Sequence, residues 1–461
     1  TVTFTFDASK LAGTSTVAFE DLYQNGRKIA THADIKDEGQ TVRFPKVRTT
    51  LVDKDTNSHV GRASNKMTLV DTVRYENLVA GKEYKVTGTL FDKETGRAIL
   101  DANGSQITAE TTFKVEKASG SVDVTFTFDS SSLAGKSVVA FEDVYNNGRK
   151  VATHADINDT DQTVVIPKIG TTLTDTKTKG HRVLAEKEVK LTDTIHYSNL
   201  TAGKEYTVEG KLIVKETGKA LLDKNKKEIT AKATFKAEKS EGDTRVTFTF
   251  DGSLLAGQSV VAFEDLYQGK LHVASHADIN DEGQTVHFPK IGTTLLNKES
   301  GKQELDPSEK VTLEDTVQYK GLEVGKEYTL KGELYSKKTG KALGVKAETT
   351  FKAEKADGVA TVTFTFNASK LAGESVVAFE HLYQDKDEIA SHTDINDAAQ
   401  TVTFRNPKET PKETPNRSNK FFNQPNTGVG GMNYKVWIGA AIGLVLLAGG
   451  GYYLYKKQDS K

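Results

Sequence analysis

The chain of 461 residues lacks cysteine altogether and contains only eight prolines, two methionines and one tryptophan. Without cysteine it forms no disulfide and offers no thiolate ligand to a metal. The formal net charge is −1 and the isoelectric point is near 6.8. The absence of a basic excess argues against a nucleic-acid partner, and no acidic tail points to a basic one. A covalent cross-link, if the chain has one, must therefore be formed by side chains other than cysteine.

What the chain does have is a constellation that recurs in a fixed order. Consecutive copies of its first residue are 122 positions apart, and within each copy the histidine precedes the last residue by eight. Self-similarity at a fixed period is the signature of a repeat architecture. The three copies are Thr49, Asp71, Glu142, His154 and Gln162; Thr171, Asp193, Glu264, His276 and Gln284; and Thr293, Asp315, Glu380, His392 and Gln400.

The repeat period predicts the domain boundaries. Residues 1–46 hold Glu20, His32 and Gln40 at the same offsets, without a preceding Thr and Asp, so we expect the second half of a fourth copy. Units of about 120 residues match ordinary domain size. We divide the chain into a partial repeat (1–46), three repeats (47–168, 169–290 and 291–404), a spacer (405–423) and a C-terminal signal (424–461).

The repeats have the pattern of β-structure. Runs such as VTFTF at 124–128 and 362–366 alternate apolar and hydroxyl residues with a period of two. Residues 84–91 and 97–100 flank KETG, which predicts a hairpin. We expect an all-β fold of tandem immunoglobulin-like or prealbumin-like sandwiches, with short connections that make consecutive domains abut as a stiff rod.

Residues 436–455 are uncharged, long enough to span a bilayer as a helix and followed by Lys456, Lys457 and Lys461. A transmembrane helix with a cytoplasmic basic tail is the prediction, and a buried core helix is the alternative. The preceding residues 405–423 repeat the tetrapeptide PKET, which is typical of an extended spacer.

A pentapeptide stands just before the apolar run. Together with that run and the basic tail, it resembles the sorting signal of Gram-positive surface proteins, although that family usually has Leu where this chain has Gln424. The resemblance implies that a sortase cuts between Thr427 and Gly428 and joins the Thr carboxyl to the cell envelope. The pentapeptide is Gln424, Pro425, Asn426, Thr427 and Gly428.

The five recurring residues are suited to forming a bond inside the protein. The carboxamide carbon of Gln is an electrophile, and the Thr hydroxyl is a nucleophile that can displace its ammonia. Two carboxyl groups buried together tend to share a proton, and a protonated carboxyl can polarise the Gln carbonyl. His, which titrates near neutrality, can carry the hydroxyl proton. A turn cap or a surface position is the alternative for any one of these residues taken singly.

The segments STVAFEDLY, SVVAFEDVY, SVVAFEDLY and SVVAFEHLY, each followed by HADI or HTDI and then QTV, resemble VaFE-repeat surface proteins with Thr–Gln ester-bond domains. The resemblance covers about 400 residues and implies self-catalysed ester formation without a cofactor. It implies the cross-links Thr49–Gln162, Thr171–Gln284 and Thr293–Gln400, assisted by the Asp, Glu and His of each set. Which threonine of each TT pair reacts stays open from the sequence.

The function we expect is that of a stalk or adhesin anchored to the cell wall of a Gram-positive bacterium, after transient membrane retention, and not that of an enzyme. Its expected partners are a sortase, a peptidoglycan or pilin acceptor, and a host or matrix ligand bound by a region upstream of residue 1. A sortase-polymerised pilus subunit is the alternative, in which Lys46, Lys168 or Lys290 would serve as the acceptor. A wall-acting hydrolase is a third hypothesis, disfavoured by three similar sites in series.

Overall fold

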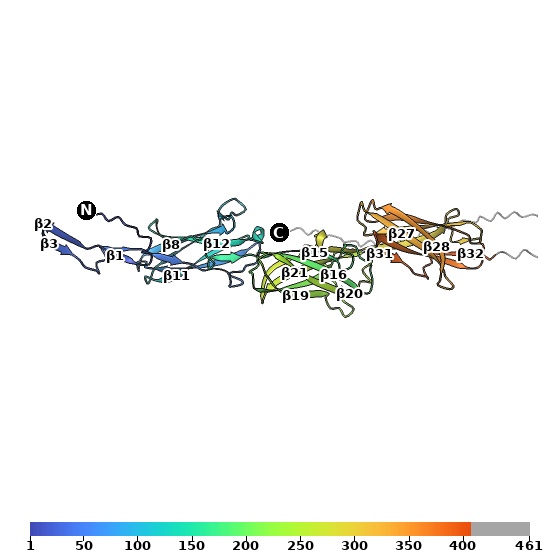
Figure 1. The fold of residues 1–461 in the computed structure, drawn as a ribbon, viewed down its shortest axis with the longest axis horizontal. Helices are drawn as coiled ribbons and strands as arrows, with labels where there is room; N and C mark the ends of the chain where they lie inside the picture. The colour runs from blue at the N-terminus through green and yellow to red at the C-terminus, as the bar shows by residue number, and fades with distance from the viewer. Residues whose placement is uncertain (407–461) are drawn as a thin grey trace, which may run out of the picture. The chain divides into compact units, whose positions relative to one another are not determined.

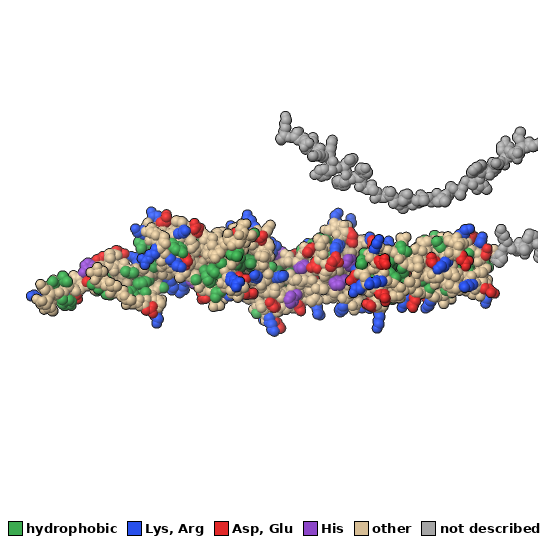
Figure 2. Space-filling model, turned by 90° about the horizontal axis from the view of Figure 1, so that it is seen from above, with side chains coloured by type: hydrophobic (Ala, Val, Ile, Leu, Met, Phe, Trp, Pro, Cys, Tyr) green, Lys and Arg blue, Asp and Glu red, His purple; other side chains and the backbone are tan. Residues whose placement is uncertain are grey.

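A computed structural model describes residues 1–406, which consist of strands joined by turns, with two short 3₁₀ helices (Figure 1). In this part of the chain no helix is long and apolar enough to cross a bilayer. The predicted sorting pentapeptide, the helix at 436–455 and almost all of the spacer lie outside the described residues. On the face that Figure 2 shows, charged side chains of both signs are scattered over the described residues.

The first domain, residues 46–166, is built from two sheets. In one sheet β11 and the pair β5 and β6 flank β7; in the other the order is β10-β8-β12-β13, with β14 beside β12 and β9 beside β8. A 3₁₀ helix, η1, spans Ser131–Leu133. The strands are β5 Lys46–Arg48, β6 Leu51–Asp53, β7 Met67–Glu76, β8 Glu83–Asp92, β9 Arg97–Ala98, β10 Thr108–Lys114, β11 Gly120–Phe128, β12 Ser137–Asn146, β13 Arg149–His154 and β14 Thr163–Val165.

The second domain, residues 168–288, repeats this arrangement with the orders β15-β16-β20 and β18-β17-β21-β22. There β15 runs unbroken where the first domain has β5 and β6, and the 3₁₀ helix η2 spans Glu282–Gln284. The strands are β15 Lys168–Asp175, β16 Val189–Ser198, β17 Glu205–Val214, β18 Lys219–Ala220, β19 Thr230–Lys236, β20 Gly242–Phe250, β21 Gln258–Gln268, β22 Leu271–His276 and β23 Thr285–Phe288.

The third domain, residues 290–404, has the sheets β24-β26-β29 and β25-β32-β30-β27-β28, with β31 beside β30. Its β28 is continuous because the chain is shorter where the other domains insert a loop. The strands are β24 Lys290–Asn297, β25 Glu304–Leu305, β26 Val311–Lys320, β27 Glu327–Ser336, β28 Ala342–Lys352, β29 Gly358–Phe366, β30 Ser375–Gln384, β31 Asp387–His392 and β32 Thr401–Phe404.

Each domain encloses its own hydrophobic core between its two sheets. In β7 the alternate residues Met67, Leu69, Val73 and Tyr75 are buried and their neighbours face outward, as period-two patterning requires. The side chain of Phe126 from β11 reaches across to the second sheet. The prediction of tandem β-sandwiches is confirmed, and so is the predicted hairpin, since β8 pairs with β9 across KETG.

Residues 1–44, the N-terminal segment, form only two-stranded pairs: β1 Ser15–Val17 with β4 Thr41–Arg43, and β2 Glu20–Gln24 with β3 Arg27–His32. Side chains whose equivalents are buried in the complete domains are exposed here. Phe4 is 60% exposed and Leu22 is 60% exposed, whereas Leu266, at the position equivalent to Leu22, is fully buried. The segment therefore has the strands of half a sandwich.

Candidate functional site

The threonine that faces the core is the first of each TT pair. Thr49 lies between β5 and β6 and is 4% exposed. Thr50 faces outward, where its hydroxyl accepts a hydrogen bond from the Arg74 guanidinium at 3.0 Å. Alternation along an extended chain allows only one of two adjacent residues to face the core. In the other domains the inward threonines are Thr171 and Thr293, which also contact the glutamate of their set.

The two carboxyl groups come from opposite sheets. Asp71 lies on β7 opposite Leu51, two residues beyond Thr49, so its side chain shares the inward face with that threonine. Glu142 lies on β12 of the other sheet, directly opposite His154 of β13. Asp71 is fully buried and Glu142 is 1% exposed. The equivalent pairs in the other domains, Asp193 with Glu264 and Asp315 with Glu380, are buried to the same degree.

The glutamine completes the site from the turn before the last strand. Gln162 is fully buried and its side-chain amide donates hydrogen bonds to the Thr49 hydroxyl and to Glu142. The Thr49 hydroxyl in turn donates to Glu142 at 3.2 Å. These contacts recur with Gln284 in the second domain and Gln400 in the third, where the amides meet their glutamates at 2.6 and 2.5 Å.

The carboxyl pair holds a proton. Burial and the neighbouring charge of Asp71 raise the pKa of Glu142 to about 11, and burial also raises the pKa of Asp71. Because two adjacent buried carboxyl groups cannot both ionise easily, Glu142 is the protonated member. The same causes raise the pKa of Glu264 and Glu380 well above the usual range.

Several oxygens of the site are buried without a hydrogen-bond partner, which is rare in a folded protein. In the first domain these are both carboxyl oxygens of Asp71, Oε1 of Glu142 and Oε1 of Gln162. The proton retained by Glu142 is a donor that can serve one of them. The same atoms are unpartnered in the second and third domains. Recurrence in three domains indicates a chemical role rather than an isolated packing fault.

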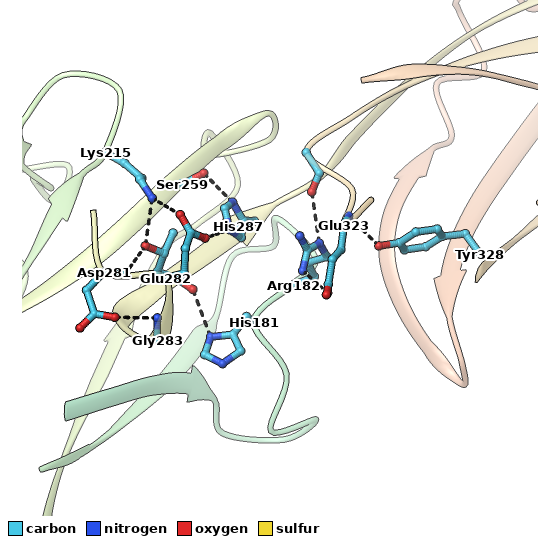
Figure 3. A network of polar contacts seen from close by, with 12 residues as sticks. His181, Arg182, Lys215, Ser259, Asp281, Glu282, Gly283, His287, Glu323 and Tyr328 are labelled. Atoms are coloured by element: carbon cyan, nitrogen blue, oxygen red, sulfur yellow. Dashed lines mark hydrogen bonds and ion pairs between the residues drawn. The ribbon is translucent and has the colours of Figure 1, made fainter. Parts of the chain in front are cut away.

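The histidine stands at the rim of the site. The side chain of His154 is 20% exposed, and its Nε2 lies 2.9 Å from a carboxylate oxygen of Asp159. The sequence analysis did not single out this aspartate, although it recurs five residues after each histidine and three before each glutamine. In the second domain Asp281 holds His276 in the same way, at 2.9 Å. Asp281 also accepts a hydrogen bond from the backbone N–H of Gly283 (Figure 3).

A glycine that the sequence analysis also missed makes room for the glutamate. Gly210 of β17 lies opposite Glu264, and a Cβ atom built there would come within 2.8 Å of the Phe248 ring and 3.6 Å of the glutamate Oε1. Gly88 and Gly332 occupy the same place in the other domains. In the sequence, the only indication of a role for this glycine is that it recurs at the same position of each repeat.

The N-terminal segment carries the second half of the same site. His32 contacts Asp37 at 2.7 Å, and Glu20 pairs with His32 across β2 and β3. With its amide turned over, Gln40 donates to Glu20 at 3.3 Å. Thus the Glu, His and Gln come together without a Thr and Asp from an opposing sheet.

Each complete domain therefore brings a nucleophile and a carboxamide into contact in a buried pocket with a proton-holding carboxyl pair. Within residues 1–406, no group of three or more His, Asp or Glu side chains is arranged to hold a metal ion. Fold and site together define a class of protein: tandem β-sandwich domains, each with an internal Thr–Gln contact between its first strand and its last.

The chain belongs to the family described as "T-Q ester bond containing domain", which matches residues 1–44, 45–166, 167–288 and 289–404. Membership thus extends over four consecutive segments and includes the N-terminal one. The family is defined by a bond within a structural domain, and it indicates no enzyme. A comparison with curated protein sequences finds no match.

Among solved structures, a Mobiluncus mulieris adhesin with intramolecular disulfide, isopeptide and ester bonds is 14% identical, with a TM-score of 0.23 over 55% of this chain and 88% of that one. The C-terminal domain of a Streptococcus agalactiae AgI/II polypeptide is 11% identical, with a TM-score of 0.23 over 50% and 97%. A fragment of a bacterial ice-binding adhesin is 12% identical, with a TM-score of 0.22 over 79% and 98%. Scores this low carry no argument about fold or function.

Proposed function

We propose that this protein is a surface stalk or adhesin whose domains stabilise themselves by forming Thr49–Gln162, Thr171–Gln284 and Thr293–Gln400 ester bonds. The observation that carries the proposal is the buried contact between each threonine hydroxyl and a glutamine amide. It is surrounded by the same three side chains each time. The family to which the chain belongs is named for this bond.

In the proposed reaction, Oγ1 of Thr49 attacks Cδ of Gln162. The new C–O bond forms as the C–N bond of the carboxamide breaks. The hydroxyl proton is taken up by a base in the site and returned to the departing NH₂ group, which leaves as ammonia. Nothing else is consumed, so the reaction needs no cofactor or co-reactant, and each domain reacts once.

The protonated Glu142 is the electrophilic assistant in this scheme. Its Oε1 and the Gln162 Oε1 are both buried without partners, and a proton shared between them would stabilise the oxyanion as the tetrahedral intermediate forms. Asp71 keeps that proton on Glu142 through its neighbouring charge. His154 is the base that accepts the Thr49 proton and passes it to the departing NH₂ group, which leaves as ammonia.

We further infer that the sandwiches are of the immunoglobulin-like or prealbumin-like type, and that residues 424–428 and 436–455 form a sorting signal. A sortase would then cut after Thr427 and join the chain to peptidoglycan. The order of pentapeptide, uncharged run and basic tail supports this assignment. Domains cross-linked in series suit a stalk that must resist proteolysis and force.

Intact mass of the purified chain tests the central claim. We expect three ammonia losses, and Thr49→Ala should restore one of them. Thr50→Ala is the matched control because that side chain faces outward beside Arg74, and it should leave all three losses in place. A full unmodified mass would refute the proposal, whereas retention of the bond in Thr49→Ala would refute only the choice of nucleophile.

A further inference from the structure

The connection that follows each threonine-bearing strand crosses to the other sheet of its domain. In the third domain it forms β25, which pairs in parallel with β32, the strand that begins directly after Gln400. In the first and second domains an isolated parallel bridge takes its place, between Val60 and Val165 and between Arg182 and His287. We call residues 59–61, 181–183 and 303–305 the crossing segments.

Each crossing segment is held by backbone hydrogen bonds to the last strand of its domain. In the third domain the N–H of Thr403 donates to the carbonyl of Gln303 at 2.7 Å. The equivalent bonds to the carbonyls of His59 and His181 are both 2.8 Å. Because a crossing segment lies in the chain between the threonine-bearing and aspartate-bearing strands, these bonds tie the last strand to the opposite sheet independently of any cross-link.

The side chain at the first position of the third crossing segment holds the turn that carries the reacting glutamine. Nε2 of Gln303 donates to the carbonyls of Ala398 and Ala399 at 3.0 and 2.8 Å. These carbonyls belong to the two residues that precede Gln400. The N–H of Leu295, on the threonine-bearing strand β24, donates to the same Ala399 carbonyl at 2.9 Å. Gln303 thus fixes the turn at the point where it meets the threonine strand.

Histidine occupies this position in the other two domains and makes fewer bonds to the turn. Nδ1 of His181 lies 3.1 Å from the carbonyl of Thr285, the residue after Gln284 (Figure 3). Since a carbonyl only accepts, Nδ1 carries the proton and donates it. In the first domain Nδ1 of His59 is buried without a hydrogen-bond partner among the described residues. The side chain at this position therefore holds the glutamine turn most firmly in the third domain and least in the first.

How firmly this turn is held should affect the rate of the reaction. The threonine Oγ1 and the glutamine Cδ must meet in a narrow range of distance and orientation, and a small displacement of either group lowers the rate steeply. The contacts among threonine, glutamate and glutamine recur in all three domains, so they do not distinguish one domain from another. The side chain of the crossing segment does.

We propose that Gln303 is a positioning residue for the ester bond of the third domain, and that a glutamine at position 59 would serve the first domain in the same way. This inference rests on the proposed function. The carboxamide of Gln303 holds backbone carbonyls rather than the reacting atoms. Its effect is therefore exerted through the position of Gln400.

The rate of each bond can be followed during cell-free synthesis of the full chain. Samples are quenched in acid at intervals, and the three cross-linked peptides are quantified separately by mass. Each variant is compared with the wild type at the same bond, and the other two bonds are internal references. The variants are Gln303→Met, which keeps the length without a donor, and Gln303→His, the residue of the other domains. The control is Gln318→Met, at an exposed position of β26 in the same domain.

We expect the third bond to form roughly tenfold more slowly in Gln303→Met, because two hydrogen bonds of ordinary net strength are lost. Gln303→His should have an intermediate rate, and Gln318→Met should react like the wild type. A wild-type rate in Gln303→Met would overturn the proposal.

Loss of folding is tested in chains that cannot form the third bond. In Thr293→Ala, adding Gln303→Met should leave the third domain folded at the temperature of synthesis, as measured by thermal unfolding. A fall in the folded fraction large enough to account for the slower reaction would show that Gln303 acts on folding alone, and would overturn its assignment as a positioning residue.

Position 59 provides the reciprocal test. His59→Met should leave the rate of the first bond unchanged, because no hydrogen bond from Nδ1 is lost. His59→Gln should raise that rate severalfold by donating to the carbonyls of Thr160 and Asp161, which correspond to those of Ala398 and Ala399.

If the side chain at this position served only to pack the crossing segment, methionine would affect the first and third domains equally, and that result would overturn the proposal. So would a wild-type rate in His59→Gln. A wild-type chain that loses no ammonia would instead refute the proposed function itself.

Discussion

At the residue scale, the site causes two neighbouring carboxyl groups to differ in their protonation. Asp71 and Glu142 have similar intrinsic acidity, but they meet where neither has water and where each feels the other's charge. One proton is enough for the pair, and its presence turns a carboxylate into a hydrogen-bond donor next to the Gln162 side chain. Which threonine of each TT pair faces the glutamine is also decided at this scale, by which of two adjacent side chains points inward.

The retained proton predicts a pH dependence in a domain that has not formed its bond. The folded state holds the Glu142 proton up to a pKa of about 11, whereas the unfolded chain releases it near its ordinary value of 4.5. A raised pKa contributes stability that is present at low pH and lost as pH rises. In Thr49→Ala, the free energy of unfolding of the first domain should fall by up to about 1.4 kcal/mol per pH unit above pH 5.

Chemical denaturation from pH 5 to pH 9 measures this slope. Adding Glu142→Gln to Thr49→Ala should reduce this slope, because an amide has no proton to release and only the raised pKa of the buried Asp71 then contributes. The second and third domains, which keep their threonines, serve as internal references. An undiminished slope in the double variant would show that Glu142 is not the proton holder.

At the element scale, the site depends on how closely two sheets approach. Glu264 sits on a central strand between Gly210 of β17 and His276 of β22, and Phe248 from the opposite sheet covers the glycine. A side chain at this glycine would push the sheets apart close to the contact between the threonine and the glutamine. The turn before β23 supplies the other constraint, since Asp281 fixes the path of the chain into Gln284.

Gly210→Ala should therefore impair both packing and chemistry in the second domain. The added methyl group would lie 2.8 Å from the Phe248 ring, and overpacking of this kind costs about 1–3 kcal/mol. We expect a lower midpoint of thermal unfolding for this domain and a reduced yield of its ester bond. Gly170→Ala, in open space on the same domain, is the control and should do neither. Full bonding in Gly210→Ala would show that sheet separation does not limit the reaction.

At the scale of the whole molecule, each proposed bond closes nearly an entire domain. Thr171 and Gln284 are 113 residues apart, on the first strand and just before the last. A cross-link over so long a loop restricts the unfolded chain most, in the same way as a long-range disulfide. If the proposed bonds form, the chain obtains without cysteine the stabilisation that secreted domains often take from disulfides.

Removing one bond should lower the stability of one domain only. For Thr171→Ala we expect a loss of about 4–5 kcal/mol by the loop-entropy estimate, which corresponds to roughly 10–20 °C in the unfolding midpoint of a domain of this size. Differential scanning calorimetry of the full chain resolves the affected transition. Thr172→Ala, which leaves the inward hydroxyl in place, should unfold like the wild type. Equal midpoints for both variants would mean that the bond does not stabilise the fold.

The N-terminal segment provides a further prediction at this scale. Gln40 has Glu20 and His32 beside it but no Thr and Asp from a facing sheet, and Thr49 already faces Gln162 in the first domain. In a recombinant chain that consists of residues 1–461 alone, we therefore expect Gln40 to remain an amide and residues 1–44 to be cleaved first in limited proteolysis. Tryptic mapping that finds Gln40 joined to any threonine of this chain would contradict this.

The sequence by itself determined the repeat, the β-sandwich class and the five side chains of each site, because a fixed spacing across three copies survives in the linear order of residues. The period of two in strands such as β7 fixes which face is buried, and that information is local. The sequence also contained Asp159 and Gly88 at constant positions, yet nothing in the linear order distinguished them from other recurring residues.

Only the tertiary structure decided what those residues do. Whether Thr49 or Thr50 faces the glutamine depends on the register of β5 and β6 against β7, which long-range pairing sets. The raised pKa of Glu142 arises because a strand from the other sheet places Asp71 against it away from water. Each of these properties is a distance between residues far apart in the chain, and such distances are fixed only when the sheets close.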